Sequence, residues 1–566
     1  MLLIILSWIY ILITTIHLGY CLDKLINLNN NNFVITAFLG LFSTTIIATI
    51  WAIFGRINIE FHIFLLVLNS IIFILNKSKV FEIYNKFIAE FKCLNYSLQL
   101  YLLGITLLII AQCAAKPYII DNESYYIQTI KWINEYGFVK GLANLHIFFG
   151  QTSGWHIAQS VFNFSFLYSN FNDLSGFCLM LGIIFAVFNL NSFFDNGIKI
   201  YLIVGLLPIA NVLLFQFISA PSPDLPVYIF SFVIFFYFVE NFNKPSVQKF
   251  NLLVILSLFV VFIKPTALAI VLIPFLFFVA NFKLLKYKLA ISFVLSVLVV
   301  ALFVIKNTII TGYPLYPTQL FSCVYYDFKV PNTLVSFYFD ETKLYGFYSN
   351  QAEFNSMSKF QIFIKWLTLN NINSILNISI LILVLISSFV IYKYYNKKAY
   401  WLLYLILIFQ FGMLLFTSPQ FRFFIHFSLF FSFMILGCFL NSKKSILFIL
   451  FGSSSILVFF VLVSINYSAL TSNKLIQENS HFTISEIIFP HSNSKLISYF
   501  HKCNIGNLNY NSPDENSYFW TNGNGKLPCV NSQQINYFIL NYHFIPQMRT
   551  KELKDGFYSK KVSTNE

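Results

Sequence analysis

Apolar runs long enough to cross a membrane recur along this chain from Leu2 almost to Val463. A helix of about 20 apolar residues spans a hydrocarbon core ~30 Å thick. Helices are expected because a lipid-exposed backbone must satisfy its own hydrogen bonds. Of 566 residues, 58% are hydrophobic and only 10% are charged, which excludes a soluble fold. The sequence therefore predicts an all-α polytopic membrane protein.

About fourteen spans are expected, and the region around Lys264 and Pro265 decides the count. This Lys-Pro pair interrupts an apolar run, which forms either one kinked helix or two short ones. Two crossings place the lysines of the short loops on one side, which we interpret as the cytoplasmic side. The expected spans are 2–18, 33–54, 61–75, 98–115, 174–190, 198–218, 227–239, 252–263, 267–280, 289–305, 375–392, 401–416, 423–440 and 446–463.

The same charge pattern predicts the domain organisation. We expect a membrane domain over 1–467, with large external loops at 116–173 and 306–374, and an external α/β appendage over 468–566. Strand-like runs such as Ile535 to Asn541 alternate with Asn-rich turns in the appendage. The net charge of +14 comes largely from lysines in short loops, so nucleic acid is not an expected partner.

An acidic motif opens the first large loop as Asp121-Asn122-Glu123-Ser124-Tyr125-Tyr126. Carboxylates just beyond a transmembrane helix can accept a proton from a hydroxyl or hold a divalent cation. Alternatively, Asp121 is only the N-cap of the helix that follows. The spacing predicts an amphipathic helix from there to Gly137, lying on the membrane surface. A second short helix is expected from Thr152 or Ser153 toward Phe164.

Three strings continue this loop: Lys131-Trp132-Ile133, Gly141-Leu142-Ala143-Asn144-Leu145-His146 and Ser153-Gly154-Trp155. Together with the acidic motif and the segment 312–317, they resemble an uncharacterised family of large polytopic bacterial membrane proteins. That family is itself similar to the GT-C glycosyltransferases. The resemblance implies a GT-C-like fold in the bacterial inner membrane, with the large loops and the C-terminus periplasmic. It also implies inverting transfer of a sugar from a polyprenyl-phosphate donor to a glycan or glycolipid acceptor of the cell envelope.

On this resemblance Asp121 is the candidate catalytic base. Glu123 would orient the acceptor or help to hold a divalent cation, Mg or Mn, which only some GT-C enzymes need. Asp224 is the one acid of an apolar external turn, and either faces the same site or only forms the turn. Tyr313 and Tyr316 either stack on a sugar or anchor the chain at the interface. The expected substrate-binding residues are Lys131, Trp132, Asn144, His146, Trp155, Asp224, Tyr313 and Tyr316.

A lipid-phosphate donor needs cations near the membrane surface. The candidates at external helix ends are Lys264, Lys306 and Arg422, with His426 about one turn after Arg422. Each cation has an alternative role as a side chain that snorkels from a helix end, and His426 as a core histidine. In the tail, Cys503 and Cys529 are expected to form a disulfide.

Three functions fit this sequence. The first is the GT-C-like glycosyltransferase. The second is a polysaccharide polymerase or a flippase for lipid-linked oligosaccharides, although charges within the spans are scarce for an ion-coupled transporter. The third is a non-catalytic envelope scaffold, in which Asp121 and Glu123 could be replaced without consequence.

Overall fold

The computed structural model describes residues 1–322, 324–370, 372–469, 471, 473–496, 499–514 and 517–562. Within these residues, eleven helices are long and apolar enough to cross a membrane. Three further apolar segments are shorter, namely Val247–Ile263, Pro265–Ala280 and Ile425–Phe439. The predicted polytopic helical architecture is confirmed. The fourteen expected spans overlap these segments, of which eleven have the length of a full crossing.

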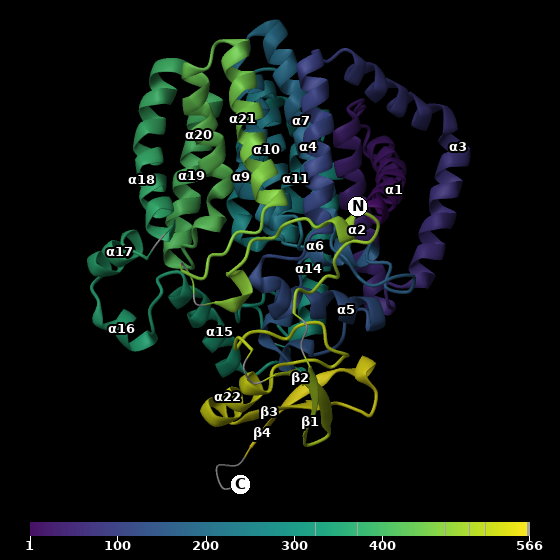
Figure 1. Ribbon diagram of the computed structural model, residues 1–566, viewed down its shortest axis with the longest axis vertical. Coiled ribbons are helices and arrows are strands. Elements are labelled where there is room, and N and C mark those ends of the chain that lie inside the picture. The colour runs from purple at the N-terminus through teal and green to yellow at the C-terminus, as the bar shows by residue number, and fades with distance from the viewer. Residues whose placement is uncertain are drawn as a thin grey trace.

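The long helices form one bundle (Figure 1). The helices of its first half are α1 (Leu2–Ile26), α2 (Phe33–Phe54), α3 (Ile59–Lys92), α4 (Tyr96–Ala114), α7 (Leu174–Asn196), α8 (Lys199–Gly205), α9 (Asn211–Leu214) and α10 (Asp224–Asn241). Those of the second half are α11 (Val247–Ile263), α12 (Leu272–Ala280), α13 (Phe282–Leu285), α14 (Ala290–Thr311), α18 (Ile372–Val390), α19 (Lys398–Phe416), α20 (Ile425–Phe439) and α21 (Lys443–Leu462).

Helices α1 and α2 pack unusually close because small residues face each other. A Cβ atom added at Gly19 would lie 1.9 Å from the Thr36 carbonyl oxygen, and one at Gly40 would lie 1.8 Å from that of Thr15. Small residues let helix backbones approach within a membrane, where dispersion rather than water exclusion drives association. Substitution of either glycine would force these two helices apart.

The chain reverses direction at Lys264 and Pro265 instead of continuing as one kinked helix. The rings of Phe250, at the start of α11, and Phe278, near the end of α12, lie 6.0 Å apart. Such a contact requires the two segments to run antiparallel with Lys264 at their turn. This geometry agrees with the two-segment alternative that the lysine pattern favoured.

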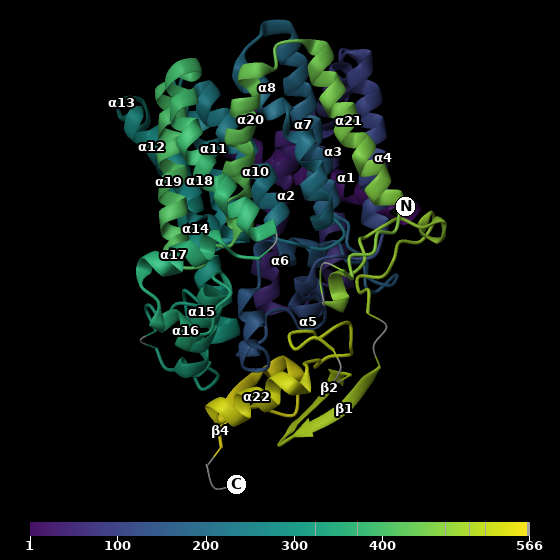
Figure 2. The ribbon, with the colours of Figure 1, turned by 60° about the vertical axis from the view of Figure 1, so that its left-hand side comes forward.

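One end of the bundle, here the lysine end, collects short loops. Lys199 donates to Asn441 Oδ1 at 2.9 Å, and Lys443 lies over the Phe194 ring, so the α7–α8 loop and the α20–α21 loop meet there. Helix α13, which carries Lys283, also lies far from the strands (Figure 2).

The opposite end, here the loop end, carries the two large loops and the tail, residues 464–562 (Figure 1). The loop helices are α5 (Ile127–Tyr136), α6 (Gly154–Val161), α15 (Asn332–Tyr345), α16 (Gln351–Ser356) and α17 (Lys359–Leu367). Helix α6 begins where a short helix was expected, and Ser153 caps it, because its hydroxyl accepts from Trp155 N. Helix α5 does not lie exposed on a membrane surface: Ile127 to Ile130 and Trp132 to Asn134 are buried, because the tail covers the face that points away from the bundle.

The tail folds as two antiparallel hairpins and a helix. Strands β1 (Phe500–Ile505) and β2 (Leu508–Pro513) pair, as do β3 (Phe544–Met548) and β4 (Phe557–Lys561). The strand expected at 535–541 was wrong, since these residues lie in helix α22 (Ser532–Tyr542). Asn531 caps this helix by accepting from Gln533 N, and apolar residues at helical spacing outweigh the short strand-like run.

The expected disulfide in the tail is not formed, and both Cys503 and Cys529 are free. Cys503 belongs to β1, whereas Cys529 bridges the opposite edge of β2 at Asn511. Two strand spacings of about 4.8 Å therefore separate their backbones, which exceeds the reach of a disulfide.

Candidate functional site

Asp121 lies at the loop end, between α4 and a π-helical turn formed by Asn122–Tyr126. Its side chain makes no capping hydrogen bond. Instead, Oδ2 accepts from Arg422 Nη1 at 2.9 Å, and the Tyr126 hydroxyl lies 3.5 Å away. The capping role was therefore wrong, because this carboxylate faces a cation from the far end of the chain.

Arg422 connects Asp121 to a second ion pair. It belongs to the turn between α19 and α20, and its Nη1 lies 3.9 Å from Asp224 Oδ2. Asp224 begins α10 and also pairs with Lys264 at the turn after α11. The four residues Asp121, Arg422, Asp224 and Lys264, here called the charge cluster, thus alternate in sign and join four segments.

The charge cluster has an open side and a closed side. The side chains of Asp121 and Arg422 are 27% and 31% exposed, whereas that of Asp224 is 3% exposed. Burial lowers the pKa of Lys264 to about 8, although Asp224 opposes the shift. Burial opposes the charge on Arg422 too, but Asp121 and Asp224 raise its pKa. A ligand would therefore meet Asp121 and Arg422 first.

Arg422 keeps hydrogen-bonding capacity for such a ligand. Its Nε donates to Gln420 Oε1 at 2.9 Å, and its carbonyl oxygen accepts from the Tyr228 hydroxyl at 2.7 Å. Among the residues that the structure describes, Nη2 donates no hydrogen bond to the protein. Guanidinium nitrogens with free N–H groups bind carboxylate or phosphate oxygens well.

Aromatic side chains from three segments border the charge cluster. Tyr125 and Phe148 come from the first large loop, Tyr338 from α15, and Tyr518 and Trp520 from the tail; these five form the aromatic cluster. Phe148 is central, with ring centroids 5.6 Å from Tyr125, 5.6 Å from Tyr338 and 4.5 Å from Trp520. Burial, followed by the charge of Asp121, raises the pKa of Tyr338 and of Tyr518, so both phenols lie near that carboxylate.

No sequence pattern predicted this aromatic cluster. Only Tyr125 belongs to a string that was singled out, and no spacing connects Phe148, Tyr338 and Trp520. A chain with 70 Phe, 33 Tyr and 7 Trp offers too many aromatic residues for composition to select these five.

Glu123 does not join Asp121. Its side chain is buried and accepts from Ser494 Oγ at 2.7 Å, Lys495 N at 3.0 Å and Asn122 Nδ2 at 3.2 Å. Its backbone oxygen accepts from Asn522 N and Gly523 N. Burial raises the pKa of Glu123 despite these donors. This residue therefore fastens the tail to the first large loop.

The two carboxylates of the motif do not fit a divalent cation. Asp121 is neutralised by Arg422, and Glu123 is saturated by donors from the tail. Within the described residues, no group of three or more His, Cys, Asp or Glu side chains could hold a metal ion. The residues present thus favour charge stabilisation by Arg422 and Lys264.

Most of the expected substrate-binding residues of the first large loop hold the tail or the core. Lys131 donates to the carbonyl oxygens of Asn524 and Gly525, Trp132 is fully buried, and Trp155 donates to Ser175 Oγ.

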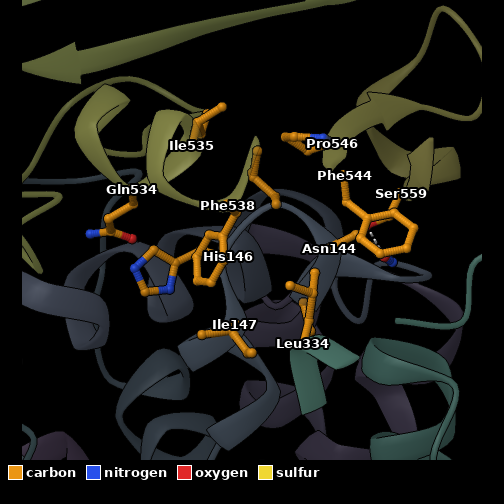
Figure 3. Close-up of a pocket in the computed structure, with 12 residues that line it drawn as sticks. Asn144, His146, Ile147, Leu334, Gln534, Ile535, Phe538, Phe544, Pro546 and Ser559 are labelled. Atoms are coloured by element: carbon orange, nitrogen blue, oxygen red, sulfur yellow. Dashed lines mark hydrogen bonds between the residues drawn. The ribbon is translucent and has the colours of Figure 1, made fainter. Parts of the chain in front are cut away.

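Asn144 and His146 lie under the tail (Figure 3). Asn144 donates to Phe328 O and accepts from Ser559 Oγ. With α22 and β3, His146 lines a cavity of about 20 Å³, room for one water. Burial lowers the pKa of His146 to about 3, so its ring is neutral.

The two tyrosines of segment 312–317 have separate roles. Tyr313 donates to Val330 O at 2.8 Å and pins the second large loop. Tyr316 donates to Ile147 O at 2.9 Å, and its ring stacks on Tyr338 at 5.6 Å. Tyr316 thus supports the aromatic cluster from behind.

Of the four expected phosphate-binding residues, the structure brings Arg422 and Lys264 together. Lys306 is buried in α14, where it donates to the Thr152 carbonyl and not to a residue of the charge cluster. His426 follows Arg422 by one turn, as expected, and its buried ring stacks on Tyr228 with centroids 6.4 Å apart. It lies behind the cluster rather than on its open side.

Comparison with known proteins places the chain in a family. The model of the family described as "Domain of unknown function (DUF8201)" matches residues 1–429, which include the complete charge cluster. No curated protein matches the chain significantly, and no solved structure does. The chain belongs to the DUF8201 family.

Proposed function

We propose that this protein is a GT-C-like, inverting glycosyltransferase of a bacterial inner membrane. It would transfer a sugar from a polyprenyl-phosphate donor to a glycan or glycolipid acceptor of the cell envelope. The observation that carries the proposal is the contact between Asp121 and Arg422 on the open side of the charge cluster. A carboxylate and a free guanidinium nitrogen side by side suit a reaction between a hydroxyl and a phosphate ester.

Three residues of the charge cluster would have separate roles in the transfer. Arg422 Nη2 would bind an oxygen of the donor phosphate, and Lys264 would add positive charge behind it. Asp121 would accept the proton of the acceptor hydroxyl. The acceptor oxygen then bonds to C1 of the sugar as the bond from C1 to the phosphate oxygen breaks. The polyprenyl phosphate leaves with that electron pair, and its new charge is held by the two cations.

The position of the cluster suits a donor with a lipid tail. Asp224 begins a membrane-spanning helix and Arg422 precedes another apolar helix, so the charges lie where the bundle ends. A polyprenyl chain could remain in lipid while its phosphate reaches this level. The lysine end would face the cytoplasm by the positive-inside tendency, and the loop end would face the periplasm.

Replacement of Asp121 by Asn tests this proposal, because Asn keeps the shape of the side chain and removes the base. The variant is expressed in a strain that lacks the protein, and envelope glycans and lipid-linked sugars are compared by mass spectrometry. Glu135→Gln is the matched control, since Glu135 is an exposed acid of the same loop.

The proposal predicts that Asp121→Asn reproduces the deletion, with a missing sugar and accumulated donor, while Glu135→Gln restores the wild-type pattern. If Asp121→Asn also restores the wild-type pattern, the proposed transferase function is contradicted and a transport or scaffold role is favoured instead. Equal amounts of membrane-inserted protein are verified in each strain.

A further inference from the structure

The tail covers the loop end and also positions residues 517–525 there. Asn522 Nδ2 donates to the Ser124 carbonyl, and Gln128 Nε2 donates to Gly523 O at 2.9 Å. These bonds fix residues 517–525 directly beside the acidic motif. Because Tyr518 and Trp520 lie in this segment, the tail holds Tyr518 within electrostatic reach of Asp121 and stacks Trp520 on Phe148.

Three residues of the aromatic cluster have polar tips without a hydrogen-bond partner among the described residues. Among the residues that the structure describes, Trp520 Nε1 and the hydroxyls of Tyr338 and Tyr518 make no hydrogen bond. By contrast, the Tyr125 hydroxyl of the same cluster donates to Gln151 Oε1 at 3.2 Å. Two of these residues, Tyr338 and Trp520, contact the same Phe148 ring.

An aromatic body with a free polar tip suits a pyranose ring. The apolar C–H face of such a ring packs on an aromatic side chain, and its hydroxyls need donors and acceptors at the edge. The charge cluster nearby suits the anionic donor instead. The aromatic cluster therefore suits a neutral ligand, whereas the charge cluster suits a charged one.

The two clusters also divide along the chain. All four residues of the charge cluster lie within the 429 residues that match the family, whereas Tyr518 and Trp520 lie beyond them. We infer that Tyr338, Tyr518 and Trp520 form the acceptor subsite, which binds a neutral pyranose ring and selects the acceptor. This inference rests on the proposed glycosyl transfer, and it assigns specificity to the tail.

Saturation-transfer difference NMR on the full chain in lipid nanodiscs tests the subsite without any transfer reaction. The probes are the methyl pyranosides of glucose, galactose, mannose and N-acetylglucosamine. At least one should receive saturation, strongest on the protons of one ring face. Trp520→Ala should weaken that signal about tenfold through lost stacking, and Tyr338→Phe about fivefold through one lost hydrogen bond.

Tyr499→Phe is the control, because Tyr499 is an exposed tyrosine of the same tail outside the aromatic cluster, and its signals should equal those of the wild type. If no sugar receives saturation, or if Tyr338→Phe leaves the signals unchanged, the subsite is contradicted. Should Trp520→Ala loosen the tail, as limited proteolysis would show, Tyr338→Phe decides, since Tyr338 lies on α15. The Asp121→Asn glycan test does not depend on the NMR measurement of sugar binding, so failure of the subsite and failure of the proposed function are distinguishable.

Discussion

Asp121 and Glu123 stand two residues apart, yet they serve different regions of the molecule. Asp121 points to the helix bundle, is 27% exposed and contacts Arg422. Glu123 points to the tail, is 1% exposed and accepts three hydrogen bonds. Residues at positions i and i+2 of a helical turn do not face each other. A pair of acids at this spacing therefore serves two regions: Asp121 belongs to the charge cluster, and Glu123 attaches the tail.

The largest expected effect on this comparison comes from Arg422→Ala. This change removes the cation shared by Asp121 and Asp224 and the free Nη2 group. We expect transfer to fall by about 100-fold or more, as for loss of a group that stabilises transition-state charge. The rate is measured in membrane vesicles as donor consumed and glycan formed.

Arg422→Lys is the control for this experiment. It keeps one positive charge but loses the planar guanidinium with its paired N–H donors, so the transfer rate should lie between those of the wild type and Arg422→Ala. Equal rates in Arg422→Ala and wild type would show that the charge cluster is only structural.

The pH dependence should give the next largest effect. The pKa of Lys264 is lowered to about 8, so its ammonium loses its proton near pH 8 instead of above 10. Positive charge beside Asp224 is thus present below pH 8 and is lost as pH rises through that value. Transfer rates between pH 6 and 10 should fall several-fold, with a midpoint near 8.

Lys264→Arg identifies the group responsible, because arginine stays charged throughout this range. The alkaline fall should then disappear. A fall that persists unchanged in this variant would assign the midpoint to another group.

Glu123→Ala tests the attachment of the tail, which is the role of Glu123 in this comparison. It leaves the donors of Ser494 and Lys495 without their acceptor, which should weaken attachment of the tail by about 1–3 kcal/mol. Hydrogen exchange of residues 493–496 should accelerate, and limited proteolysis should release the tail sooner. Glu135→Ala, on the exposed face of the same loop, should match the wild type in both measurements.

Asp327→Asn should have the smallest effect. Asp327 pairs with Arg549 of the tail at 2.7 Å, but its side chain is largely exposed. Exposed pairs contribute about 0–1 kcal/mol, so thermal unfolding and tail release should barely change. A loss as large as that of Glu123→Ala would show that surface charge, not the buried carboxylate, holds the tail.

The fold could be predicted far better than the site. Apolar runs predicted the polytopic helical architecture, and lysine positions predicted the reversal at Lys264, because the membrane imposes length and charge rules on local sequence. The contact between Asp121 and Arg422 crosses 301 residues, and no periodicity relates positions so far apart. Arg422 was recognised only because cations at helix ends are scarce.

Burial by the tail explains most of the misplaced residues. Lys131, Asn144 and His146 looked like ligand contacts because they are polar residues in an expected surface loop. The tail covers them: Asn524 accepts from Lys131, Ser559 donates to Asn144, and α22 lies over His146. Docking of one polar segment on another cannot be recognised in either sequence. The i and i+2 spacing of Asp121 and Glu123, however, could already have predicted that these two side chains face different regions.

The most direct test compares Asp121→Asn with Glu123→Gln, measuring glycan product and proteolytic protection of the tail in the same membranes. We expect that Asp121→Asn loses the product while tail protection stays at the wild-type level. Glu123→Gln should lose protection, and should lose product only in proportion to the tail released. If Asp121→Asn retains product, or if Glu123→Gln abolishes product with the tail fully protected, the assignment of chemistry to Asp121 and attachment to Glu123 is contradicted.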